Sequence, residues 1–551
     1  MFFRTVATSA AILVALAVTG AVAGPDWEPA PVTAHLHPAS PSTAIGGALA
    51  DGAEPGDYEV RETQVTIPLA DGIEVGGLLR EPIYPGGSGD DSGGETAGPP
   101  AADRPGIVFV HGAGTGKAAD AFTLAATALA SAGIVTLVPD KRLDNYTTRH
   151  RDYEAMALDY AHSVAFLRDV PGVDPDQVGL YAESEGAWVS PVMMVEDPRL
   201  AFQILVSAPV VPPRQQAAYA VDNYLRNTDV PADVFRAIPR AVGMKLPGGG
   251  FEYADFDARP WLKQQDDPIL AVYGTKDASM PLEQGTRELL DDADDVTVRF
   301  YEHANHGINV ETPEGLVLHP DFAADVADWV LGLPRTASAP PQIAGAQPEQ
   351  LYLAAPVPQP HWYGDGDWLV GVVVTAGGLL VVGPLLVGGT ALAGRLARRR
   401  SGRPGVRLAP GLRGPLAGLG AGAAATMIGL VAYLAAVARL ALDYQKDALV
   451  VQGGWIGVRV LGIVAVVAAA LLLNRLRDLR GHAVLAPAVE LASRLEPGPG
   501  DEPDARAEPT SRAHTSRPSA VVVSTGFWLT LLGATALLVT LAYWGAYQLG
   551  I

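Results

Sequence analysis

The sequence contains no cysteine among its 551 residues. Disulfide bonds, catalytic thiolates and thiolate metal sites are therefore excluded. The absence does not argue against export, because an exported domain without disulfides can rely on its own hydrophobic core. No grouping of His, Asp and Glu has the spacing of a metal site, and no cofactor motif is present, so we expect neither a metal nor a cofactor.

Positive charge is also scarce. The chain has 39 Lys and Arg against 60 Asp and Glu, which gives a formal net charge of -21 at pH 7. Binding to nucleic acid requires a basic surface that neutralises phosphates, so we expect no nucleic-acid partner. The length exceeds that of one typical domain, so two or more structural units are expected.

Charged residues are nearly absent from several long stretches. Arg4 precedes an apolar run that ends in Ala21-Val22-Ala23. This pattern is typical of a secretory signal peptide over residues 1–23 with an A-x-A cleavage site, and an uncleaved anchor helix is the alternative. Four further apolar segments have about the length needed to cross a hydrocarbon core of ~30 Å. They are residues 369–393, 416–438, 455–473 and 520–544.

The loops between these segments predict their orientation. The first loop, 395–414, contains seven Arg and no acidic residue. The second, 439–454, contains one Arg, one Lys and two Asp, and the third, 474–519, contains seven Arg and as many acidic residues, which count for little in this rule. Because Lys and Arg are enriched in cytoplasmic loops, the first and third loops are predicted to be cytoplasmic. We therefore expect a multi-pass cell-membrane protein with an all-α transmembrane region over 368–551 and an extracytoplasmic domain before it.

Between residues 61 and 335, short apolar strands alternate with helices. This alternation predicts an α/β fold with a mostly parallel sheet that is covered on both faces. A hairpin is expected around Ala70-Asp71-Gly72, followed by strands at 106–110, 134–139, 177–181, 202–207, 268–274 and 296–302 and helices at 117–132, 151–169, 186–195 and 319–332. Less regular segments are expected as a loose leader at 24–60, a low-complexity insertion at 86–103, a lid insertion at about 210–265 and a Pro-rich linker at 336–367.

The stretch GLYAESEGAW, residues 179–188, places Ser184 between an expected strand and an expected helix. A serine hydroxyl is a weak nucleophile that needs an adjacent base and a site for oxyanion charge. The small residues Ala182 and Gly186 permit the sharp strand-to-helix turn on which such a serine is exposed. The pattern A-x-S-x-G is one substitution away from G-x-S-x-G. An ordinary turn serine is the alternative.

Two downstream side chains complete a candidate catalytic set with Ser184. Asp277 follows the strand at 268–274, and His306 lies in a loop after the strand at 296–302. The order Ser, Asp, His along the chain is the order expected for this sheet topology. Asp277 has an alternative role as a helix cap, for which Ser279 is also available. His303 competes with His306, which we favour because it precedes a glycine in the looser loop.

An oxyanion site is expected where the strand at 106–110 runs into His111-Gly112-Ala113-Gly114. Glycine in this turn lets backbone N–H groups point at a developing negative charge. We propose the N–H groups of Ala113 and Glu185 as its donors. For His111 a structural role is favoured over a ligand role. For Lys141 and Arg142 a surface or packing role is favoured over binding of an anionic substrate.

These motifs resemble those of the α/β-hydrolases. VFVHGAG, VTLVPDKR, VDPDQVGLYAESEGAWVSP, VYGTKDASMP and HANHG occur in the order of that family. Residues 61–335 are similar to secreted bacterial hydrolases grouped with dienelactone hydrolase and the acyl-peptidase/esterase branch. The resemblance implies Ser184 as nucleophile, His306 as general base and acid, and Asp277 as orienting carboxylate. The chain departs from the family at Ala182, at Glu185 and in its four-helix C-terminal region.

The sequence thus predicts a membrane-anchored, extracytoplasmic serine hydrolase that cleaves carboxyl esters through an acyl-enzyme. Its partners are expected to be a small-molecule or lipid acyl ester substrate and membrane lipid, and the sequence does not identify protein partners. Peptidase, thioesterase and acyltransferase activities remain open, as does a non-catalytic ligand-sensing domain that signals through the helices. Glu183 and Glu185 either point to solvent or face the pocket, where they would raise the pKa of His306 and repel anionic substrates.

Overall fold

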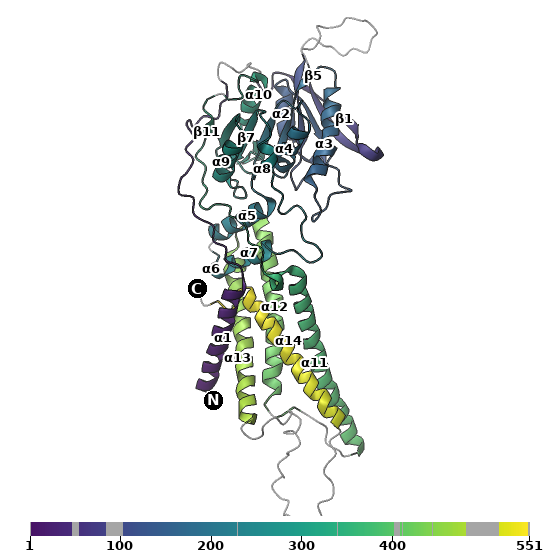
Figure 1. Cartoon of the computed structure of the whole chain (residues 1–551), viewed down its shortest axis with the longest axis vertical. Coiled ribbons are helices and arrows are strands. Elements are labelled where there is room, and N and C mark those ends of the chain that lie inside the picture. Colours follow the sequence, from purple (N-terminus) through teal and green to yellow (C-terminus); the bar gives the residue numbers. More distant parts are fainter. Residues whose placement is uncertain are drawn as a thin grey trace, which may run out of the picture. The chain divides into compact units, whose positions relative to one another are not determined.

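The computed structural model describes residues 2–46, 54–83, 103–228, 230–338, 340–401, 408–409, 411–442, 445–480 and 517–548 (Figure 1). Nearly all of the insertion expected at 86–103 and parts of both Arg-rich loops lie outside these residues. The chain divides into two compact units. The sheet unit comprises Glu28–Asn223 and Gly249–Val357, and the helical unit comprises Met1–Trp27, Tyr224–Gly248 and Pro358–Ile551.

The sheet unit is built on a nine-stranded sheet with the order β1-β2-β4-β3-β5-β6-β7-β8-β11. The strands are β1 (Glu59–Pro68), β2 (Glu74–Ile83), β3 (Arg104–Val110), β4 (Val135–Pro139), β5 (Val173–Glu183), β6 (Gln203–Val206), β7 (Ile269–Gly274), β8 (Val296–Tyr301) and β11 (Ile343–Gly345). β2 pairs antiparallel with β1 and β4, and all other neighbouring strands are parallel. The expected hairpin and mostly parallel sheet are confirmed.

The central strands are apolar along their length because helices cover both faces of the sheet. Successive side chains of a strand point to opposite faces. Ile107 and Phe109 of β3 therefore join the core beneath α2 (Thr123–Ser131) and α10 (Phe322–Gly332). Val108 and Val110 join the opposite core, beneath α3 (Tyr153–Arg168) and α4 (Gly186–Glu196). The helix expected at 117–132 begins only at Thr123, after a short 3-10 turn at Ala118–Asp120.

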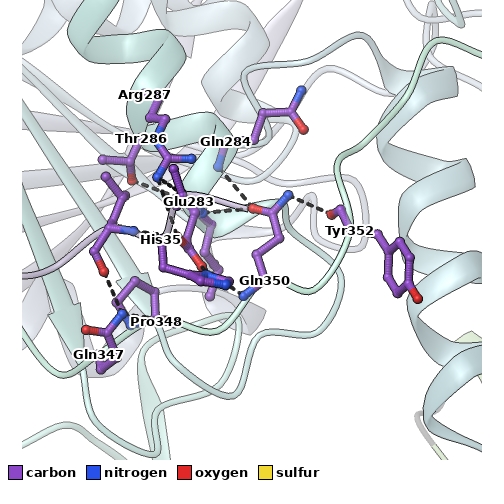
Figure 2. A network of polar contacts seen from close by, with 12 residues as sticks. His35, Glu283, Gln284, Thr286, Arg287, Gln347, Pro348, Gln350 and Tyr352 are labelled. Carbon is purple, nitrogen blue, oxygen red and sulfur yellow. Dashed lines mark hydrogen bonds and ion pairs between the residues drawn. The ribbon is translucent and has the colours of Figure 1, made fainter. Parts of the chain in front are cut away.

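The segments expected as a leader and a linker make specific contacts in the sheet unit (Figure 2). Glu283, near the start of α9 (Leu282–Asp292), is fully buried. Its carboxylate accepts hydrogen bonds from the N–H groups of Leu36 (2.6 Å) and Gln350 (3.1 Å) and lies 2.8 Å from Nδ1 of His35. Residues near the two ends of the unit are thereby joined at one helix. The strand β11, which pairs with β8, also lies in the segment expected to be a linker.

The segment interpreted as a lid, 210–265, does not form one body. It contains the helices α5 (Pro213–Asn227), α6 (Ala232–Phe235), α7 (Ala237–Val242) and α8 (Arg259–Leu262). Its central part, Tyr224–Gly248, belongs to the helical unit, and the remainder belongs to the sheet unit. A further hairpin that the sequence did not predict, β9 (Asn309–Thr312) with β10 (Gly315–Leu318), follows β8.

Among the described residues, five helices are long and apolar enough to cross a membrane. They are α1 (Phe2–Ala23), α11 (Gly366–Ser401), α12 (Arg413–Leu442), α13 (Gly454–Arg480) and α14 (Arg517–Tyr543). Each of the four apolar segments expected after residue 368 lies in one of these helices, except that the last segment extends one residue past the end of α14. Within the helical unit, α1 packs against α13 and α14, α11 against α14, and α12 against α13 and α14 (Figure 1).

Candidate active site

The sheet unit has the α/β-hydrolase fold, with an antiparallel second strand, β3 inserted between β4 and β5, and helices on both faces. In open parallel sheets of this kind, ligands bind beyond the carboxyl ends of the strands. The candidate site residues predicted from the sequence all follow the carboxyl ends of strands. Ala113 follows β3, Ser184 follows β5, Asp277 follows β7, and His306 follows β8.

Ser184 occupies a sharp turn between β5 and α4. Its φ angle is 56°, in the left-handed region that a residue with a side chain rarely adopts. The turn is held by the N–H of Ser184, which donates to the carbonyl of Val206 at 2.9 Å, and by the N–H of Ala187, which donates to the carbonyl of Ser184 at 3.0 Å. A Cβ atom at position 186 would lie 2.5 Å from the carbonyl oxygen of Val110, so only glycine fits there.

Asp277 and His306 form a hydrogen-bonded pair. Nδ1 of His306 lies 2.7 Å from Oδ2 of Asp277, whose side chain is 1% exposed. The other carboxylate oxygen accepts hydrogen bonds from the N–H (3.0 Å) and the hydroxyl (2.6 Å) of Ser279. The next helix, α9, begins after Pro281 without a side-chain cap. Asp277 therefore orients a histidine and does not cap that helix.

The histidine paired with Asp277 is His306 and not its competitor His303. The side chain of His303 is 71% exposed and lies beside Glu302. His306 is in turn tied to the end of β6, because the hydroxyl of Ser207 donates to the carbonyl of His306 at 2.7 Å. Val206, the residue before Ser207, accepts the hydrogen bond from the N–H of Ser184. Adjacent residues of one strand end thus hold both the serine turn and the histidine loop.

Carboxylates set the protonation of this pair. Burial alone would lower the pKa of His306, but the carboxylates of Asp277 and Glu183 outweigh burial and raise it to about 9. Burial would raise the pKa of Asp277, but its bonds to His306 and Ser279 hold it below its usual range. Burial raises the pKa of Glu183, a half-buried side chain at the end of β5, and His306 opposes that rise.

The turn after β3 lies close to the serine. A Cβ atom at Gly112 would lie 3.3 Å from Cβ of Ser184. Among the backbone hydrogen bonds of the described residues, none has the N–H of Ala113 or of Glu185 as its donor. These are the two N–H groups that were predicted from the sequence as the donors of an oxyanion site. They leave two donors beside the serine without a protein acceptor.

His111 has a structural place in this turn. Its ring nitrogens lie 3.0 Å from the hydroxyl of Thr115 and 2.7 Å from the carbonyl of Pro139, and its N–H donates to the hydroxyl of Tyr160 at 3.1 Å. Burial lowers the pKa of His111 to about 4, so the ring is neutral at pH 7. Both ring nitrogens are engaged within the protein, which fits a role in shaping the loop.

The sequence analysis predicted a backbone role for Glu185 and left its side chain as either solvent-facing or pocket-facing; the structure buries that side chain in a charged cluster. The residue is 1% exposed, and its carboxylate binds Nζ of Lys141 at 3.0 Å and a guanidinium nitrogen of Arg151 at 2.6 Å. Arg142 instead pairs with Asp144 and Asp159. The sequence offered no sign of this cluster, because its members are separated by 34 and 44 residues and belong to no local motif.

A cavity of about 350 Å³ borders the same edge of the sheet. It is lined by Glu183 and Gly307, the neighbours of Ser184 and His306, and by Asp120, Phe122, Tyr181 and Leu124 among others. Its volume falls in the range of small-ligand sites. Among the described residues, no group of three or more His, Asp or Glu side chains is arranged to hold a metal ion.

Comparison with solved structures found similar chains that cover about half of this one. An esterase of Pyrococcus furiosus, Pf2001, is 15% identical over 54% of this chain and 99% of its own, with a TM-score of 0.33. A dienelactone hydrolase from Anabaena variabilis is 16% identical over 49% and 97%, with a TM-score of 0.32. A cold-adapted esterase from an Arctic intertidal metagenomic library is 15% identical over 51% and 97%, with a TM-score of 0.29. No family model and no curated protein matched the chain.

Proposed function

We propose that this protein is a serine hydrolase that cleaves carboxyl esters through an acyl-enzyme. One observation carries the proposal. The strained turn of Ser184 and the Asp277–His306 pair are both held by the end of β6, through Val206 and Ser207. Strain at a non-glycine residue is retained where a side chain must be presented in one direction, as in the nucleophile turn of hydrolases.

The chemistry follows from these side chains. The hydroxyl oxygen of Ser184 attacks the acyl carbonyl while Nε2 of His306 takes its proton, and Asp277 fixes the ring through Nδ1. The negative charge on the carbonyl oxygen is received by the N–H groups of Ala113 and Glu185. The bond to the leaving alcohol then breaks, and His306 returns the proton to it. Water attacks the acyl-enzyme by the same route and releases the acid and the free serine.

The charges that line the cavity favour neutral or cationic esters. Glu183 and Asp120 both line it, and within its lining they are not offset by Lys or Arg. Phe122, Tyr181 and Leu124 add apolar surface that suits a short acyl or alkyl group. Ser184 and His306 do not line this cavity, so the preference for a small neutral ester over a phosphorylated ester or an acyl-CoA rests on Glu183, the lining residue next to Ser184.

We further propose that the helical unit anchors the chain in the cytoplasmic membrane with the sheet unit outside. The Arg-rich loops 395–414 and 474–519 carry the orientation, because basic loops remain in the cytoplasm.

The test is hydrolysis of a neutral p-nitrophenyl ester by the full chain in detergent micelles. We expect Ser184→Ala to lower kcat by about 10⁴-fold or more while the protein remains folded. Ser131→Ala, which removes another serine hydroxyl at the end of α2, is the matched control and should retain activity. A Ser184→Ala protein as active as the control would contradict the proposal.

A further inference from the structure

The buried charged cluster around Glu185 is more than a set of packing contacts. The carboxylate of Glu185 is bound by Lys141 (3.0 Å) and Arg151 (2.6 Å), and the hydroxyl of Tyr146 donates to it at 2.9 Å. The hydroxyl of Tyr153 lies 3.4 Å away. One carboxylate with two cations leaves a net charge of +1 next to the serine turn. Burying such charges is costly, and an apolar cluster would often be as stable, so stability alone does not explain it.

Both cations lie over the Tyr146 ring, but Lys141 makes one hydrogen bond that Arg151 does not. Its Nζ donates to the carbonyl oxygen of Gly112 at 2.6 Å, and it also lies 4.5 Å from the centre of the Tyr146 ring. An ammonium group has three N–H donors. Here they meet the Gly112 carbonyl, the Glu185 carboxylate and an aromatic face. Lys141 is 3% exposed, so no donor is left for an anionic substrate.

The contact with Gly112 has a direct consequence for the next N–H group. The carbonyl of Gly112 and the N–H of Ala113 belong to one planar peptide unit. In a trans peptide these two groups point in opposite directions. A cation that holds the carbonyl oxygen therefore fixes the direction of the Ala113 N–H away from Lys141. It also polarises the peptide and makes that N–H a stronger donor.

The same ammonium holds the second proposed donor. Its bond to the Glu185 carboxylate ties the side chain of the residue whose own N–H stands beside Ser184. Gly112 and Ser184 approach each other closely, as the 3.3 Å distance from a Cβ at position 112 shows. One buried lysine thus connects the loop after β3 to the turn after β5, the two segments that supply the two N–H groups.

We propose that Lys141 is a positioning residue for the oxyanion site, because it holds the Gly112 carbonyl and the Glu185 side chain so that the N–H groups of Ala113 and Glu185 converge. This inference rests on the proposed hydrolase function. Lys141 touches neither the substrate nor the reacting atoms. Its effect should therefore be felt when charge develops on the carbonyl oxygen and not when the ester binds.

The test compares two double variants of the full chain with equal charge. Lys141→Met/Glu185→Gln removes the cation that holds Gly112, and Arg151→Met/Glu185→Gln removes the other cation. Each leaves one cation and no carboxylate, so the net charge of the cluster stays at +1 in both. Both also remove the two ion pairs that Glu185 makes, with Lys141 and with Arg151, so similar costs in stability are expected. They differ in whether the Gly112 carbonyl keeps its cation.

We expect the Lys141 double variant to have a kcat about 100-fold below that of the Arg151 double variant, with a similar KM, because one oriented oxyanion donor contributes about that much. It should also bind a boronic acid that forms a tetrahedral serine adduct about 100-fold more weakly. Equal kcat values and equal boronate affinities in the two variants would overturn the inference.

A further readout covers the case in which the Lys141 double variant does not fold. In Lys141→Ala, added ethylammonium should restore kcat in a saturable manner, because a small cation can occupy the vacated position. A merely structural lysine would not be rescued in kcat at constant KM, and that result would also overturn the inference. Failure of the hydrolase proposal is seen separately, since the wild-type chain itself would then neither turn over the ester nor bind the boronate.

Discussion

Glu183 and Glu185 are separated by one residue, but the turn at Ser184 gives their carboxylates different surroundings. Glu185 is buried and neutralised by Lys141 and Arg151. Glu183 is half-buried, lines the cavity and acts electrostatically on His306. The sequence analysis treated the two carboxylates alike, with both facing solvent or both facing the pocket. At the residue scale, Glu183 alone has a place from which it can affect a substrate.

The first prediction concerns discrimination against anionic esters. Glu183→Gln should raise the ratio of kcat/KM for an anionic ester to that for a neutral ester by roughly 3- to 10-fold at low ionic strength, since one nearby charge contributes about 1 kcal/mol or a little more. Paired p-nitrophenyl esters with and without a carboxylate measure this ratio. Asp120→Asn, which removes the other carboxylate of the cavity, is the matched comparison. A ratio that does not change in either variant would contradict the assignment of the cavity.

The second prediction concerns pH. His306 must be neutral to accept the proton of Ser184, and its pKa is raised to about 9. Protonated His306 predominates below that value, so kcat/KM should rise with pH and level off above about pH 9. Glu183→Gln removes one of the carboxylates that raise this pKa, so the rising limb should move to lower pH. The measurement is the pH profile of both proteins; a limb that stays in place or moves upward would contradict the electrostatic account.

Asp277→Asn extends the same reasoning. It removes the larger of the two carboxylate effects on His306 and disturbs the ring orientation. We expect kcat to fall by about 10⁴-fold, as is usual when the orienting carboxylate of such a set is neutralised. Residual activity at wild-type level would exclude Asp277 from this role.

Site residues could be selected from the sequence where they stand in local motifs. Ser184, Asp277 and His306 each stand in a short pattern after a strand, and the structure pairs Asp277 with His306. Their joint role in catalysis stays a prediction. The Lys141–Glu185 contact could not be predicted, because it depends on how two strand ends approach each other in space.

At the scale of elements, α1 has the contacts of an integral helix of the helical unit. The hydroxyl of Thr8 donates to Asn474 of α13 at 3.1 Å, and Arg4 pairs with Asp478 of α13 at 2.6 Å. A Cβ atom at Gly20 would lie 2.1 Å from the carbonyl oxygen of Ala542, so α1 and α14 approach closely there. Small residues at such contacts and interhelical hydrogen bonds are typical of associated membrane helices.

The third prediction is therefore that residues 1–23 are retained, the alternative to the cleaved signal peptide that the A-x-A pattern suggested. The intact mass of the protein purified from membranes should include α1. Gly20→Leu should weaken the packing of α1 on α14 and lower the melting temperature, while Gly371→Leu, in a helix position with open space, should not. A mature chain that begins at Gly24 would contradict the prediction.

Strands and helices were predicted from the periodicity of apolar residues, so strands without a clear apolar pattern were missed. The strands from β1 to β8 are buried runs or alternating segments long enough to be recognised. The hairpin of β9 and β10 was missed because its strands are exposed or half-buried, whereas β6, which also has only four residues, is buried along its length. The strand β11 has three residues in a Pro-rich stretch and exists because the edge of β8 accepts it.

At the scale of the whole molecule, the chain combines an α/β-hydrolase sheet unit with a unit of apolar helices. Both were predicted, because strand–helix alternation and long apolar runs are strong patterns. The division of residues 210–265 between the units was not. The division depends on contacts between residues far apart in the sequence, such as the hydrogen bond at 2.7 Å from the Arg240 guanidinium to the carbonyl of Gly20. The local pattern of apolar residues does not predict such contacts.

The fourth prediction concerns the orientation of the chain in the membrane. Because the chain has no cysteine, it can be tested by labelling single introduced cysteines. Any introduced thiol is the only one in the chain. A cysteine at Asp176, whose side chain is 82% exposed in the sheet unit, should react with a membrane-impermeant maleimide in intact cells. A cysteine at Arg399, near the end of α11, should react only after the cells are permeabilised. The reverse pattern would place the sheet unit in the cytoplasm.

The most direct test of the central claim is the site of covalent labelling by a fluorophosphonate probe in membranes that contain the full chain. The account predicts a single adduct on Ser184, mapped by mass spectrometry, which is absent in Ser184→Ala and reduced by a competing neutral ester. A folded wild-type chain that forms no adduct, or an adduct on another serine that persists in Ser184→Ala, would contradict it.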